Sequence, residues 1–147
     1  MSNKEIEAWK IHTAKKKDIF VSTKVKTIHP VVDRIVSQLL EIDLIKFVRV
    51  TESDLQASNS IAIKGRAKIP ISTPGHPTAI GVHLMIDASE NQIQFFEITS
   101  AIKGYGERIV RAVLTSIPDD WKAVIIMDYS DGFWDKMARK YNKILIL

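Results

Sequence analysis

Apolar residues recur along the chain with two periods, one typical of strands and one typical of helices. The β-branched run 19–25 predicts a first strand. After Pro30, apolar residues return at helical spacing and predict a helix over 30–42. Residues 44–50 could extend this helix or begin a second short element, and the polar residues 51–59 predict a loop.

The middle of the chain alternates apolar residues with small or polar ones. Residues 60–69 predict a half-buried strand, and the proline-containing stretch 70–77 predicts a loop. Two further strand-like segments, 79–87 and 92–99, are separated by Ala88-Ser89-Glu90-Asn91. They predict an antiparallel hairpin.

The last third of the chain predicts a strand–helix–strand crossover. An apolar stripe from Ile109 to Ile117 predicts a helix that ends before Pro118. The nearly continuous apolar run 121–127 predicts an internal strand parallel to its neighbour across the helix. Residues 131–141 then predict a helix, and 144–147 a closing strand. The whole order favours one mixed α/β domain over residues 1–147.

Composition narrows the function classes. With 147 residues and 46% hydrophobic content, the chain can bury one core. The absence of cysteine excludes disulfides, thiolate metal sites and cysteine nucleophiles, and the spacing of the four histidines fits no metal signature, so we predict no metal. Residues 1–20 do not resemble a secretory signal, and no apolar run reaches the length of a membrane span. We therefore expect a cytoplasmic protein without a membrane partner.

Positive charge is concentrated in the N-terminal half. Residues 1–75 carry 13 Lys and Arg against 8 Asp and Glu, whereas residues 76–147 carry 8 against 9. Residues 1–18 read as a flexible basic segment. Such a lysine-rich start is either a solvated surface or a region that helps an anionic partner to approach, including nucleic acid or a phosphorylated cofactor.

The turn after the strand 92–99 is the strongest candidate for chemistry. Gly104 and Gly106 lack a Cβ atom, so the backbone can approach a ligand closely, and the following helix presents unpaired N–H groups. This arrangement binds phosphates in many proteins. The alternative is an ordinary connection between a strand and a helix.

Two motifs in this region resemble the GNAT superfamily of acyl-CoA N-acyltransferases. Lys103-Gly104-Tyr105-Gly106 is similar to the last four positions of the cofactor loop Q/R-x-x-G-x-G/A, and residues 128–137 are similar to the helix after the family's fifth strand. The similarity covers residues 79–147. It implies a central mixed, mostly antiparallel sheet with splayed central strands and helices on both faces. It also implies acetyl-CoA or another acyl-CoA as cosubstrate, with the pantetheine arm in the split between strands.

The resemblance also assigns roles to residues. The positions that would bind the CoA thioester are Phe96, Ile98, Thr99, Lys103, Gly104, Tyr105, Gly106, Glu107 and Arg108. Two positions depart from the family pattern. Ala101 stands where the cofactor loop has Gln or Arg, and Trp134 stands where the family often has a tyrosine general acid.

Glu97 and Tyr129 are the candidate catalytic residues. Glu97 would be the general base. The alternative is a strand-end charge that faces solvent or pairs with a nearby lysine, and strict strand alternation points Glu97 away from Phe96 and Ile98. Tyr129 would replace the missing tyrosine at position 134 as general acid. Among the histidines, His76 in the 70–77 loop is the one expected to reach a cleft.

Several functions fit these observations. The first is transfer of an acyl group to an amine acceptor, whose identity the sequence does not reveal. A non-catalytic protein of the same fold is the alternative, with contact to nucleic acid through the basic N-terminal half. A dinucleotide-binding fold fits less well because Ile109 occupies the position of the third glycine. The exposed edge of the closing strand is compatible with a homodimer.

Overall fold

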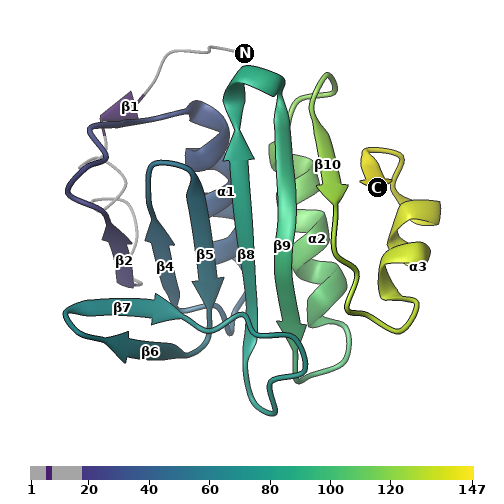
Figure 1. Cartoon of the computed structure of the whole chain (residues 1–147), viewed down its shortest axis with the longest axis horizontal. Helices are drawn as coiled ribbons and strands as arrows, with labels where there is room; N and C mark the ends of the chain where they lie inside the picture. The colour runs from purple at the N-terminus through teal and green to yellow at the C-terminus, as the bar shows by residue number, and fades with distance from the viewer. Residues whose placement is uncertain (1–5, 8–17) are drawn as a thin grey trace.

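The computed structural model describes residues 6–7 and 18–147, so most of the predicted basic segment 1–18 lies outside the described residues. Helices and strands follow one another throughout the described part of the chain (Figure 1). In order, they are β1 (Ile6–Glu7), β2 (Asp18–Val21), β3 (Thr27–Ile28), α1 (Pro30–Leu40), β4 (Phe47–Val50), β5 (Asp54–Ser58), β6 (Ile61–Lys64), β7 (Ala67–Pro70), β8 (Ile80–Asp87), the 3₁₀ turn η2 (Ala88–Glu90), β9 (Gln92–Ser100), α2 (Tyr105–Ser116), β10 (Lys122–Ile125), α3 (Phe133–Lys140) and β11 (Ile144–Ile146).

A mixed sheet forms the centre of the molecule. Its seven strands lie in the order β11-β10-β9-β8-β5-β4-β2. The pairs β4–β5, β5–β8 and β8–β9 are antiparallel, and the pairs β2–β4, β9–β10 and β10–β11 are parallel. The fold is thus mixed α+β with an antiparallel centre, as predicted.

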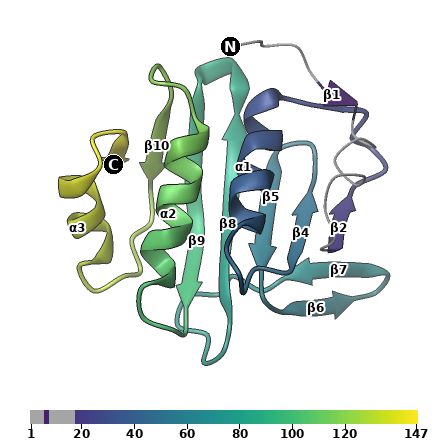
Figure 2. The same ribbon diagram turned by 180° about the vertical axis from the view of Figure 1, so that it is seen from behind.

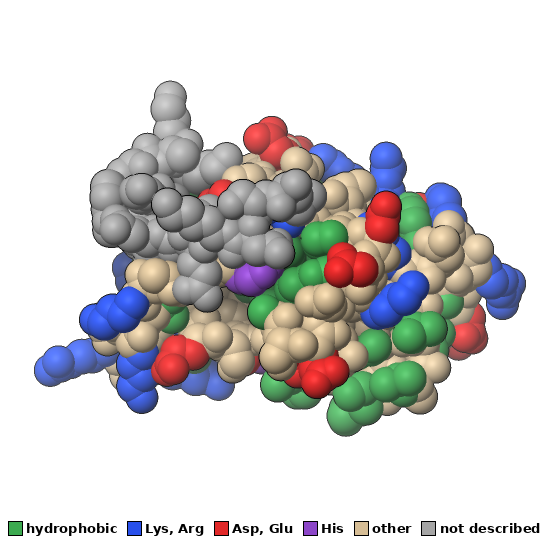
Figure 3. Space-filling view, turned by 90° about the horizontal axis from the view of Figure 1, so that it is seen from above, with side chains coloured by type: hydrophobic (Ala, Val, Ile, Leu, Met, Phe, Trp, Pro, Cys, Tyr) green, Lys and Arg blue, Asp and Glu red, His purple; other side chains and the backbone are tan. Residues whose placement is uncertain are grey.

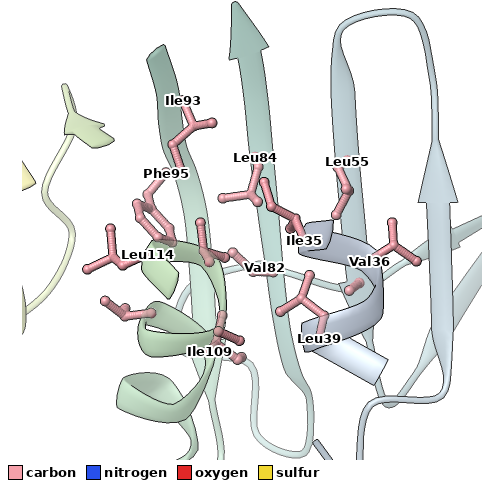
Figure 4. Close-up of a cluster of buried hydrophobic side chains, with 14 of the residues drawn as sticks. Ile35, Val36, Leu39, Leu55, Val82, Leu84, Ile93, Phe95, Ile109 and Leu114 are labelled. Carbon is pink, nitrogen blue, oxygen red and sulfur yellow. The ribbon is translucent and has the colours of Figure 1, made fainter. Parts of the chain in front are cut away.

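Helices α1 and α2 lie side by side on one face of this sheet (Figure 2). Their apolar side chains point onto β5, β8 and β9 and form the main core (Figure 4). Ile35 and Leu39 of α1 and Ile109 of α2 are fully buried there, against Leu84 and Phe95 of the sheet. The helical stripes predicted from the sequence are therefore the faces that bury this core.

The opposite face carries a β-hairpin in place of the expected helix. Strands β6 and β7 pair with each other and run across the sheet strands (Figure 1). Beyond β7 the chain crosses Gly81 of β8, where an added Cβ would lie 2.2 Å from the carbonyl oxygen of Ile71. Helix α3 lies at the side of β10 and β11. The prediction of helices on both faces is therefore wrong for the described residues.

Most predicted elements are confirmed, and three are not. Helices α1, α2 and α3, the β8–β9 hairpin, the internal parallel strand β10 and the closing strand β11 occur where expected. The first strand is shorter than predicted and ends at Val21. Residues 51–59 contain strand β5, and 60–69 form two strands instead of one. Within the described residues, no helix has the length and apolarity needed to cross a bilayer.

Candidate functional site

Strands β9 and β10 pair over a short stretch and then separate. The register joins Lys122–Val124 to Gln92–Gln94, whereas β9 continues to Ser100. In the described part of the chain, no strand pairs with residues 95–100 on the side of β10. A pocket of about 370 Å³ opens along this stretch. Its walls are residues 95–100, Gly106, the loop residues 74–76, and Met127, Tyr129, Ser130, Phe133 and Trp134.

The N-terminus of α2 lies at one end of the pocket. Gly104 is the N-cap with φ +94°, a left-handed conformation that favours glycine, and no side chain caps the helix. Gly106 lines the pocket. Among the described residues, no acceptor pairs with the backbone N–H of Gly106 or Glu107. These two donors, at the positive end of the helix, are available to an anion.

Thr99 supplies an unsatisfied group in the same pocket. Its side chain is 4% exposed, and its Oγ1 has no hydrogen-bond partner among the described residues. A buried hydroxyl without a partner costs about 1–3 kcal/mol, so such groups are uncommon in folded proteins. Thr99 lines the pocket on the part of β9 that β10 does not pair, so its hydroxyl can contact a polar group of a ligand.

A β-bulge brings Phe96 and Glu97 to one face. His83 is opposite Glu97 and Leu84 is opposite Phe95, which leaves Phe96 without a cross-strand partner. The ring of Phe96 contacts the ring of His83 at a centroid distance of 5.0 Å, so Phe96 lies on the same face as His83 and Glu97. Strict alternation, which separated Phe96 from Glu97, is wrong here because of the extra residue.

Glu97 and Tyr129 face the same opening. Both line the main pocket and a shallow adjoining one that Pro74 and Gly75 complete. The Oε1 atom of Glu97 accepts a hydrogen bond from Ser72 Oγ at 3.2 Å. Tyr129 is 61% exposed, and its hydroxyl lies 3.7 Å from the sulfur of Met127. The two candidate catalytic side chains, 32 positions apart in the sequence, thus line the same pocket.

Tyr105 and Arg108 are both tied to Asp43. The Tyr105 hydroxyl donates to Asp43 Oδ1 at 3.0 Å, Arg108 lies 3.2 Å from the same atom, and the guanidinium stacks on the Tyr105 ring. The hydrogen bond from Tyr105, with a smaller contribution from Arg108, lowers the pKa of the Asp43 carboxyl. The expected phosphate contact of Arg108 would therefore have to compete with Asp43. Lys103 is exposed at the start of the turn.

Glu107 is turned away from the helix end that could bind an anion. Its Oε2 accepts hydrogen bonds from Lys140 Nζ and from the hydroxyl of Tyr141. The Lys140 ammonium, followed by the Tyr141 hydroxyl, lowers the pKa of this carboxyl. The same contact raises the pKa of Lys140, and burial raises that of Tyr141. The carboxylate therefore belongs to the α2–α3 contact, and only the backbone of Glu107 faces the site predicted for it.

The aromatic residues of α3 form a wall of the pocket and reach into the core. Trp134 is 3% exposed and packs on Phe95 with ring centroids 4.9 Å apart. Phe133 stands against Gly106, where an added Cβ would lie 3.3 Å from the ring. Trp134 is thus a packing residue. Ala101, after the end of β9, is exposed.

His76 reaches the cleft, as predicted. Its Nδ1 accepts hydrogen bonds from the backbone N–H groups of Thr78 and Ala79, which places the ring proton on Nε2. Elsewhere, His29 caps α1 and His83 lies 2.8 Å from Asp54. In the part of the chain that the structure describes, no three His, Asp or Glu side chains are grouped in a way that could hold a metal ion.

The chain matched no known protein family, no curated protein and no solved structure. Sequence reasoning placed residues 96–99 and 104–108 on one strand and one helix end, and the structure brings them together. It missed Ser72 and Asp43, because a serine in a loop and an aspartate after a helix carry no pattern of their own.

Proposed function

We propose that this pocket binds an acyl-CoA and that the protein transfers the acyl group to an amine, as the resemblance to the GNAT superfamily implies. The observation that carries the proposal is the separation of β9 from β10 after Gln94 and Val124. The separation leaves a strand edge beside a pocket that ends at a helix N-terminus. An extended ligand with amides in its middle and phosphates at one end fits this order of features.

The strand edge suits the pantetheine arm. Residues 95–100 have backbone groups on the β10 side that no described strand pairs, and an extended amide chain can hydrogen-bond to such an edge. The buried Oγ1 of Thr99 adds a polar contact. Apolar walls from Phe95, Phe133 and Met127 suit the methylene groups between the amides.

The N-terminus of α2 suits the pyrophosphate. The free N–H groups of Gly106 and Glu107 lie at the positive end of a twelve-residue helix. Lys103 adds an exposed positive charge. The absence of a glutamine or arginine at Ala101 removes one side-chain contact, so backbone groups would provide most of the binding.

Glu97 and Tyr129 suit the chemistry of acyl transfer. Glu97 would accept the proton of the incoming ammonium, directly or through one water, so that the neutral amine attacks the thioester carbonyl carbon. The C–N bond forms as the C–S bond breaks, and the Tyr129 hydroxyl would give its proton to the departing thiolate. The new amide nitrogen would then lose its extra proton to the Tyr129 phenolate, which restores the hydroxyl. The hydrogen bond from Ser72 would hold the Glu97 carboxyl toward the opening.

Titration calorimetry with acetyl-CoA tests the binding step. Gly104→Glu places a carboxylate at the helix N-terminus and should abolish binding. Gly65→Glu is the matched control: Gly65 has φ +63°, Gly104 has φ +94°, and neither has an atom within 4 Å of an added Cβ. Both variants place the same charge at an exposed glycine with positive φ, but Gly65 lies in the hairpin, outside the residues that line the pocket.

Binding by the wild type and by Gly65→Glu, but not by Gly104→Glu, would support the proposal. No heat with acetyl-CoA or with free CoA would contradict it, as would equal loss in both variants. The acyl-transfer step is tested separately, by thiol release with a panel of primary amines.

A non-catalytic binding protein is the second candidate. Trp134 is buried in the core and cannot act as an acid, and Tyr129 is held by one weak contact to a sulfur atom. Acetyl-CoA binding without thiol release for any amine would favour this alternative over the enzyme.

A further inference from the structure

The β6–β7 hairpin is rich in basic residues and contributes no residue to the pocket of the proposed function. Strands β6 and β7 form a separate two-stranded sheet, joined by the two-residue turn Gly65-Arg66. Gly65 has φ +63° at the first central position of the turn, which is the geometry of a II′ hairpin. The hairpin runs across one end of the sheet (Figure 1).

The tip of this hairpin is positive and unneutralised. Lys64, Arg66 and Lys68 are exposed, and among the described residues none of them takes part in an ion pair. The Nζ atom of Lys68 lies 5.5 Å from the centroid of the Phe20 ring, and this contact leaves its charge without a neutralising carboxylate. The sequence contains no Asp or Glu between Asp54 and Asp87. Lys and Arg side chains project at both ends of the long axis, including the end toward which the hairpin extends (Figure 3).

An exposed apolar side chain lies among these charges. Ile63 is 70% exposed and is the cross-strand partner of Lys68, so the two share one face of the ribbon. An aliphatic side chain this exposed buries little apolar surface in the free protein and so contributes little to its stability. Beside cations it suits a partner that offers both phosphates and apolar surface.

We propose that the β6–β7 hairpin binds duplex DNA by entering its major groove. A two-stranded ribbon fits that groove, which is about 12 Å wide, and phosphates on both walls can then meet the three cations. Ile63 would contact base edges or thymine methyl groups. The major groove of duplex RNA is too narrow for this entry.

An anionic membrane is a weaker match for the same features. Stable anchoring there takes more than one apolar side chain, and each cation adds only about 1 kcal/mol near the surface. The inference does not depend on acyl-CoA binding.

Fluorescence anisotropy of a short labelled DNA duplex with the full chain tests the inference. The hairpin variant is Lys64→Gln/Arg66→Gln/Lys68→Gln. Loss of three phosphate contacts should lower the slope of log affinity against log salt by about 2.7. Between ~50 and ~200 mM salt, the affinity of the wild type should therefore fall about 40-fold more than the affinity of the hairpin variant. Ile63→Ser should weaken binding about tenfold without changing the slope.

The matched control is Lys122→Gln/Lys136→Gln/Arg139→Gln. Like the hairpin variant, it removes two lysines and one arginine, here from exposed positions on β10 and α3. This control should keep the wild-type slope, and all variants should keep the wild-type thermal midpoint and acetyl-CoA affinity.

Three outcomes would overturn the inference: no DNA binding at low salt, equal losses in the two triple variants, or hairpin-dependent binding to phosphatidylserine vesicles with none to DNA. Because the acetyl-CoA affinity of the hairpin variant is read separately, failure of this inference leaves the proposed function standing, and the reverse holds.

Discussion

Gly81 lies directly beneath the backbone of Ile71. A Cβ at this position would come within 2.2 Å of the Ile71 carbonyl oxygen and within 2.9 Å of the Ala57 oxygen. The chain that leaves the hairpin can therefore cross β8 only because position 81 has no side chain. This crossing carries Ser72 to Glu97 and then residues 74–76 to the wall of the pocket.

Gly81→Ala is expected to destabilise the fold by about 3 kcal/mol or more, because two backbone segments would have to move. The control is Gly65→Ala, where the added Cβ meets no atom within 4 Å and only the positive φ is strained. Strain at this position of a II′ turn costs roughly 1–3 kcal/mol. Urea unfolding of both variants gives the comparison. If Gly81→Ala lowered the free energy of unfolding no more than Gly65→Ala, the backbone at Ile71 would be able to move away from β8 at little cost.

Thr99→Val should separate stability from ligand binding. It replaces an unsatisfied buried hydroxyl with a methyl group of similar size, so the ligand-free protein should become more stable by about 1 kcal/mol. If the hydroxyl contacts acetyl-CoA, affinity should fall about tenfold. Thr115→Val is the control, because the Thr115 hydroxyl bonds to the Arg111 carbonyl on α2, outside the pocket. Urea unfolding and calorimetry give the two quantities. A destabilised variant would show that Thr99 has a partner in solution.

Glu97→Gln should stop acyl transfer without weakening acetyl-CoA binding. Loss of a general base typically costs 10²–10⁴-fold in rate. The loss in rate should shrink as the pH rises toward about 10.4, the pKa of a lysine-like amine, because the acceptor then loses its proton to solvent. Glu90→Gln, on the η2 turn, controls for the charge. Thiol release against pH measures the effect, and full activity of Glu97→Gln at neutral pH would exclude Glu97 as the base.

The elements with a clear apolar period were predictable from the sequence. Helices α1 and α2 each bury one stripe against a single sheet face, so the helical period is visible. Strand β5 is not predicted because residues 51–59 are mostly polar and so indicate a loop, although Asp54–Ser58 alternates polar with apolar side chains. Its polar residues Gln56 and Ser58 are nevertheless buried, because both faces of this strand are covered.

The candidate site was predictable where it depends on adjacent residues and not where it depends on long-range contacts. The strand end and the glycine turn are continuous in sequence, so their meeting at α2 follows from the connection. Residues 60–69 predict one strand instead of the β6–β7 hairpin, because the turn signal is a single glycine, Gly65. The position of Glu97 depends on a bulge, which adds one residue to the register without a sequence mark.

Glu107 should make stability depend on pH on the acid side. Lys140 and Tyr141 hold its pKa below the ordinary value of 4.5, so the unfolded chain takes up a proton first as the pH falls. The stabilising contribution is therefore fully present above pH 4.5 and is lost as the pH falls through the lower pKa of the folded state. Glu107→Gln should flatten this part of the curve.

Urea midpoints of the wild type and of Glu107→Gln, measured between about pH 3 and about pH 7, test this expectation. Glu41→Gln removes an exposed carboxylate that has no ion pair among the described residues, so it controls for net charge alone. If both variants changed the curve equally, the effect would come from overall charge. A selective change in Glu107→Gln would instead show that α3 is held to α2 by this carboxylate, and with it the position of Phe133 against Gly106 at the pocket.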